Sequence, residues 1–96
     1  MEITLDYVKA EYQAECLEQC AGDLLRQSRD VNVIISDVRR AWQGDTADVY
    51  IKKLIALEDE LRANADKCSK DAADFRARIK AFKKADEDAK AVIESG

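Results

Sequence analysis

The chain has 96 residues and a mass of 10.8 kDa, which allows one domain with a thin core. It has no histidine and no proline, only three glycines, and a formal net charge of -4. The commonest general base and metal ligand is therefore missing, and the glycines are too few and too far apart for a phosphate-binding loop. An acidic chain is also poorly suited to neutralising phosphates. We expect no enzymatic activity, no cofactor or metal, and no small-molecule or nucleic-acid ligand.

Alanine, glutamate, lysine, leucine and arginine make up close to half of the residues, a proportion typical of long helices. The longest purely apolar run, Leu54 to Leu57, is too short for a membrane span or for the apolar region of a signal peptide. The composition therefore predicts an all-α protein without a cleavable signal peptide.

The first helix is predicted over residues 5–41. An alternative strand over Val31 to Ile35 is disfavoured because the flanking residues keep helical spacing and no second strand is evident. Gly22 costs about 1 kcal/mol relative to alanine inside a helix, which predicts a kink or fraying of the segment before it. The apolar positions that carry the helical pattern recur at steps of three, four and seven: Leu17, Cys20, Leu24, Val31, Ile34, Ile35, Val38 and Trp42.

The second helix is predicted over residues 46–92, where one longer stripe runs along the chain. Its polar face places an acid four residues before a base at Asp48, Glu58, Asp66 and Asp74, each pair adding about 0.2–0.5 kcal/mol. The stripe itself consists of Tyr50, Leu54, Leu57, Leu61, Ala65, Cys68, Ala72, Phe75, Ile79 and Phe82, followed by Asp86, Ala89 and Ile93.

The turn is predicted at residues 42–45. Gly44 can adopt the left-handed conformation that ends a helix, and Asp45 can cap the next one. Because the turn divides the chain into arms of similar length, the expected fold is a two-helix antiparallel hairpin. The register about Gly44 would bring Cys20 opposite Cys68, Val31 near Leu57, and Val38 near Tyr50.

Association is expected because two helices cannot cover a wide apolar stripe on each other. A second hairpin would complete a four-helix bundle, with Leu57, Leu61, Phe75 and Ile79 at the interface. The sequence does not distinguish a homodimer from a heterodimer.

Three cysteines could carry chemistry. Cys16 and Cys20 lie four residues apart on one helix face, and Cys20 and Cys68 are equally distant from Gly44. They could be small core residues, a Cys20–Cys68 disulfide, or a metal-binding or reactive thiol site. A zinc site would lack a fourth ligand.

Two short motifs stand out at opposite ends of the predicted hairpin. Trp42-Gln43-Gly44 falls on the turn, where the simplest reading of the tryptophan is an apolar plug at the helix end. Phe82 and Asp86 form an F-x-x-x-D motif near the C-terminus, with a carboxylate on the apolar stripe. Tyr7 and Glu11 also fit an aromatic-x-x-x-acid pattern.

With its two-helix length, the chain resembles the WXG superfamily of small type VII secretion proteins. The resemblance implies a hairpin that pairs as an antiparallel four-helix bundle and is exported from the cytoplasm of a Gram-positive bacterium without a signal peptide. Trp42 and Gly44 match the turn motif. Phe82 and Asp86 match the C-terminal export motif, Y-x-x-x-D/E, which contributes to recognition by the membrane ATPase of the secretion system.

Phenylalanine in place of tyrosine at position 82 is similar to the small helical partners of LXG toxins. The function expected from the resemblance is a secreted substrate, or a targeting partner that binds a related hairpin or the N-terminal domain of a toxin. The alternative is an intracellular coiled-coil adaptor with no role in secretion.

Overall fold

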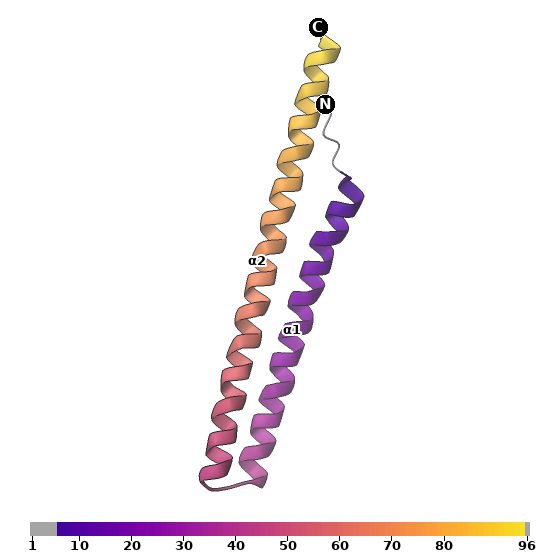
Figure 1. Ribbon diagram of the computed structural model, residues 1–96. Helices are drawn as coiled ribbons and strands as arrows, with labels where there is room; N and C mark the ends of the chain where they lie inside the picture. The colour runs from indigo at the N-terminus through magenta and orange to yellow at the C-terminus, as the bar shows by residue number, and fades with distance from the viewer. Residues whose placement is uncertain (1–5, 96) are drawn as a thin grey trace.

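The protein is an all-α antiparallel hairpin in a computed structural model that describes residues 6–95. Helix α1 runs from Tyr7 to Ala41 and helix α2 from Asp45 to Ser95. The two helices lie side by side along their length, and α2 continues beyond the start of α1 (Figure 1). The hairpin is a thin rod with extents of 78 × 19 × 15 Å. Neither helix has a stretch of described residues that is long and apolar enough to span a membrane.

The predicted helices agree with the structure to within a few residues at their ends. Asp45 was expected to cap α2 from outside but is its first helical residue, and α2 continues three residues beyond the predicted end at 92. Residue 5 lies outside the described residues. The kink or fraying predicted before Gly22 is wrong from Tyr7 onward, because α1 is continuous through this glycine. Asp6 caps α1 by accepting a hydrogen bond from the Lys9 backbone N–H at 3.1 Å.

The turn depends on Gly44, whose φ of 108° lies in the region that other residues rarely adopt. Trp42 ends α1 in an extended conformation, and its N–H donates to the Val38 carbonyl at 2.8 Å. The Gly44 carbonyl accepts from the Asp48 N–H at 3.1 Å as α2 begins. The prediction that Gly44 reverses the chain is confirmed.

Alanine substitutions at two glycines are expected to have opposite effects. Gly44→Ala should lower the free energy of unfolding by about 1–2 kcal/mol, because a side chain is strained at a positive φ. Gly22→Ala should raise it by about 0.5–1 kcal/mol, because this glycine is helical and a Cβ there meets nothing within 4 Å. Chemical denaturation monitored by circular dichroism measures both. A stabilising Gly44→Ala variant would contradict the conformation of the turn.

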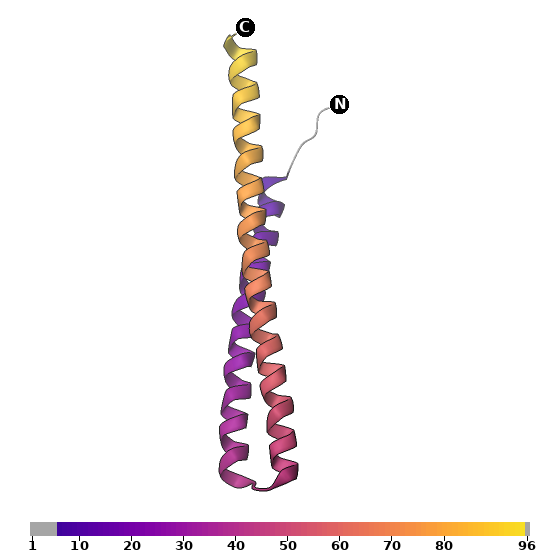
Figure 2. The same ribbon diagram turned by 90° about the vertical axis from the view of Figure 1, so that its left-hand side faces the viewer.

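The contact between the helices is a seam of residues that, in α2 as far as Ile79, are spaced alternately three and four apart. This spacing is the seven-residue repeat of a coiled coil, and Figure 2 shows the two helices passing across each other as such a repeat predicts. The most buried members are alanines, with Ala14 at 0% and Ala72 at 1% exposure. The buried or half-buried seam residues are Tyr7, Ala10, Ala14, Leu17, Ala21, Leu24, Ser28, Val31, Ile35 and Val38 in α1, and Ala47, Ile51, Leu54, Glu58, Leu61, Ala65, Cys68, Ala72, Phe75, Ile79 and Asp86 in α2.

The predicted stripe on α2 is wrong near the turn, where Glu58 rather than Leu57 lies on the seam. Glu58 is buried, whereas Leu57 is exposed. The Glu58 carboxylate accepts hydrogen bonds from Ser28 Oγ at 2.9 Å and from Asn32 Nδ2 at 3.5 Å. It also pairs with Arg62 Nε at 2.6 Å. These contacts, the Ser28 hydrogen bond above all, lower the pKa of Glu58 and keep the buried carboxylate charged.

The hairpin leaves far more surface in solvent than a compact protein of its mass. The chain exposes 7724 Å², whereas a folded monomer of this mass exposes about 5,500 Å². The radius of gyration is 22.1 Å, against about 12–13 Å for a compact domain of this length. No large side chain of the described residues is completely buried. The hairpin alone therefore forms a narrow seam rather than a full core.

Candidate functional site

The two sides of the seam differ in chemistry. One side carries Glu11, Glu18 and Arg76, which directly follow seam residues, and Lys83, which follows Phe82; these four form ion pairs between the helices. Arg76 Nε lies 3.0 Å from Glu18 Oε1, and Lys83 Nζ lies 2.8 Å from Glu11 Oε1. All four side chains are about half exposed, so each pair contributes at most about 1 kcal/mol. Both ion pairs lie far from the turn. They cover this side of the hairpin with polar groups.

The other side carries apolar residues close to the turn. Ile34, Tyr50 and Leu57 each directly precede a seam residue, which places all three on the side opposite the ion pairs. Together with Trp42 they form the apolar flank, whose members are 44–54% exposed. Large apolar side chains that stay exposed on one side of a molecule are typical of a protein–protein contact surface.

The predicted turn motif contributes directly to this flank. The Trp42 ring lies 6.0 Å from the Tyr50 ring, with the planes tilted by 37°. With Thr46, Val49 and Lys53, the two rings line a hollow of about 320 Å³. Trp42 lies at the end of α1 against Tyr50, and 54% of the residue remains exposed.

The four predicted interface residues are placed differently from one another. Leu57 belongs to the apolar flank and is available to a partner. Ile79 is buried on the seam, and Leu61 and Phe75 are half-buried there. These three pack between the helices of the hairpin itself. The residues that extend the exposed surface beside Leu57 are Ile34 and Tyr50, which were not predicted to lie at the interface.

The predicted export motif lies at the opposite end of the rod. Phe82 remains 38% exposed, and Asp86 is half-buried one turn later. The Asp86 carboxylate is engaged within the hairpin, because its Oδ2 accepts a hydrogen bond from the Tyr7 hydroxyl at 2.7 Å. This bond is the main reason that the pKa of Tyr7 rises to about 12. The sequence did not predict this hydrogen bond, because Tyr7 and Asp86 lie on different helices and meet only when the hairpin has folded.

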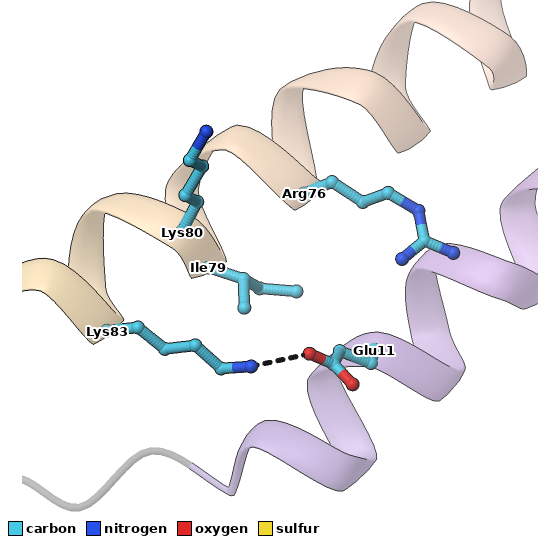
Figure 3. Close-up of a pocket in the computed structure, with 5 residues that line it drawn as sticks. All are labelled: Glu11, Arg76, Ile79, Lys80 and Lys83. Atoms are coloured by element: carbon cyan, nitrogen blue, oxygen red, sulfur yellow. Dashed lines mark hydrogen bonds and ion pairs between the residues drawn. The ribbon is translucent and has the colours of Figure 1, made fainter.

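The second aromatic-x-x-x-acid segment, Tyr7 to Glu11, lies against the first. Lys83 pairs with Glu11, and its ammonium group sits 5.2 Å from the centre of the Tyr7 ring. Figure 3 shows the neighbouring surface hollow, with Ile79 directed between the helices and Lys80 directed away from Glu11. The hollow is about 160 Å³, and Lys83, Arg76 and Glu11 line it together with these two residues. The ion pairs make this end a polar contact between the arms.

The cysteines are all free, and no cluster of metal-ligating side chains occurs among residues 6–95. Cys16 and Cys20 are exposed, whereas Cys68 is half-buried on the seam. The Cys68 and Cys20 thiols interact across the hairpin, and burial together with this contact raises the pKa of Cys68. The predicted register is thereby confirmed for this pair.

The described helices present two surfaces for recognition, the apolar flank beside the turn and the Phe82–Asp86 segment at the far end. No family model matches the chain, and neither a curated protein nor a solved structure matches it significantly. The function is therefore argued from these surfaces.

Proposed function

We propose that this chain is a small type VII secretion substrate or targeting partner that binds a second helical hairpin through the apolar flank. The exposed Leu57, Ile34 and Tyr50 beside the turn carry the proposal. On a chain with so little buried surface, covering them gains about 25 cal/mol per Å² of apolar area. The partner is a second copy, a related hairpin or the helical N-terminal domain of a toxin, and the product is a four-helix bundle.

The position of the turn motif supports this proposal. Trp42 and Gly44 form the connection between the arms, as in the family that the sequence resembles. A partner hairpin packed in the opposite direction would place its C-terminal segment beside Trp42. The composite surface would then contain residues of both chains, Trp42 from one and the Phe82–Asp86 segment from the other.

The export signal in this proposal is Phe82 with Asp86, recognised by the membrane ATPase of the secretion system. Phe82 presents an exposed ring, and Asp86 lies one turn later on the same helix. The Tyr7 hydrogen bond occupies Oδ2, and among the described residues Oδ1 accepts no hydrogen bond. The segment thus offers an apolar ring and a carboxylate oxygen side by side. The protein is cytoplasmic before export and extracellular after it.

A secretion assay in a Gram-positive host that carries a type VII system tests the export role. In the Asp86→Asn, Phe82→Ala double variant, the fraction of tagged protein or bound partner in the culture supernatant should fall at least about tenfold while pairing persists. Asp88→Asn is the matched control, because Asp88 is exposed and lies outside the motif. Asp86→Asn should also lower the pKa of Tyr7 from about 12 toward its ordinary value, which verifies the contact in solution.

Unchanged secretion of the double variant, with pairing intact, would remove the export role from this segment. Retention of the wild-type protein inside the cell, together with an intact pairing surface, would instead favour the coiled-coil adaptor.

A further inference from the structure

Cys20 of α1 and Cys68 of α2 lie near each other, close to the middle of the rod. Cross-helix contacts fix the register on either side, with Glu18 bonded to Arg76 and Ser28 bonded to Glu58. Cys68 is a seam residue, and Cys20 directly precedes the buried seam residue Ala21. The two thiols are free, and the neighbouring Cys20 contributes to the raised pKa of Cys68.

The surroundings of this pair suit a covalent link between the helices. Ala21, Ala65 and Ala72 are buried within about one helical turn of the cysteines, so small side chains allow the helix axes to approach closely. Axes about 8–10 Å apart, with Cα atoms about 2.3 Å from each axis, leave about 3.4–5.4 Å between directly facing Cα atoms and more for atoms off that line, a range that overlaps the roughly 4.4–6.8 Å that a disulfide spans.

We propose that Cys20 and Cys68 form a reversible intramolecular disulfide that clamps the two arms of the hairpin together at mid-length. The pair lies about 20 Å along α1 from Ile34, so the clamp is separate from the apolar flank. The disulfide can therefore form whichever partner binds to the apolar flank.

The oxidant is a small-molecule disulfide, and the exchange takes two steps. The exposed Cys20 loses its proton to solvent, and its thiolate attacks one sulfur of the oxidant, forming a mixed disulfide and releasing one thiolate. Cys68 then loses its proton, and its sulfur attacks Cys20 Sγ and releases the second thiolate. The two released thiolates take up protons, so two protein thiols are oxidised and one external disulfide is reduced to two thiols.

The order of these steps follows from the environments of the two sulfurs. Cys68 is half-buried and its pKa is raised, so it presents little thiolate to an external oxidant. Once Cys20 carries the mixed disulfide, the neighbouring Cys68 meets it at a high effective concentration. Cys16 is exposed on the outer side of α1 and takes no part.

The clamp should stabilise the hairpin because it closes a loop of about 50 residues that contains the turn. A loop of that length restricts the unfolded chain strongly, and the expected rise in the midpoint of thermal unfolding is at least about 10 °C. Reduction with dithiothreitol should reverse the rise.

Oxidised glutathione is the probe that tests the clamp. The full-length protein is incubated with it, the remaining thiols are alkylated, and peptide mapping by mass spectrometry locates the bonds. We expect a monomeric chain with a Cys20–Cys68 link and alkylated Cys16. Cys16→Ser is the matched control and should oxidise in the same way. Cys20→Ser and Cys68→Ser should each fail to form the link and should show no rise in the unfolding midpoint.

Three results would overturn the proposal. One is a glutathione adduct that persists on Cys20 while Cys68 remains free. Another is crosslinking only between chains through Cys16. The third is a Cys20–Cys68 bond that forms but leaves the unfolding midpoint unchanged or lower.

Discussion

Replacing Leu57 by aspartate is expected to convert the associated protein into separate hairpins. Leu57 is exposed on the apolar flank, and burying an unpaired carboxylate against a partner costs several kcal/mol. The dissociation constant should rise at least about a hundredfold. Sedimentation equilibrium or light scattering at micromolar concentration measures the mass, and circular dichroism checks that the helices remain.

The matched control is Ala63→Asp, which adds the same charge on the same helix. Ala63 is exposed and lies on the face turned away from the seam, so association should be unchanged. A wild-type chain that is a cooperatively folded monomer at micromolar concentration would contradict obligate association. Equal weakening by Leu57→Asp and Ala63→Asp would show that charge alone, rather than the apolar flank, governs pairing.

Replacing Ala72 by aspartate is expected to unfold the hairpin itself. Ala72 is 1% exposed on the seam between the helices. A larger side chain has no room there, and a charged side chain has no partner. The free energy of unfolding should fall by about 3–5 kcal/mol, a large share of the stability of a chain of this length. Thermal unfolding followed by circular dichroism, with variants at equal concentration, measures the loss.

The neighbouring residue provides the control. Ala73 is exposed, so Ala73→Asp introduces the same group one position away and should change the free energy by less than about 1 kcal/mol. Ala72→Leu should fall between the two, at about 1–3 kcal/mol, because overpacking costs less than an unpaired buried charge. Similar losses from Ala72→Asp and Ala73→Asp would mean that the alanines do not form the contact between the arms.

The fold could be predicted from the sequence because local signals agree along the whole chain. The absence of proline, the helical spacing of apolar residues and the acid–base pairs all favour helix, and Gly44 supplies the reversal. Three of the four predicted acid–base pairs form ion pairs, those of Arg62, Lys70 and Arg78. The fourth, between Asp48 and Lys52, makes no ion pair among the described residues.

The identity of the seam could not be predicted by selecting large apolar residues. Two neighbouring stripes run along α2, one through Leu57 and one through Glu58, and apolarity favoured the first. A regular alternation of three and four residues from Ala47 onward identifies the second, because Leu57, Leu61 and Ala65 are separated by two successive steps of four. The alternation places Leu57 one position before the seam residue Glu58, so Leu57 remains exposed although it is apolar.

The surroundings of the candidate sites were decided by the tertiary structure alone. The sequence identified Trp42, Gly44, Phe82 and Asp86 as individual signals, since unusual residues at a turn or on an apolar stripe can be recognised locally. That Tyr7 donates a hydrogen bond to Asp86 depends on the register of two helices whose contacting residues lie far apart in the chain. Side chains from opposite ends of a chain meet only when the whole length between them has folded, so spacing within one helix carries no information about such contacts.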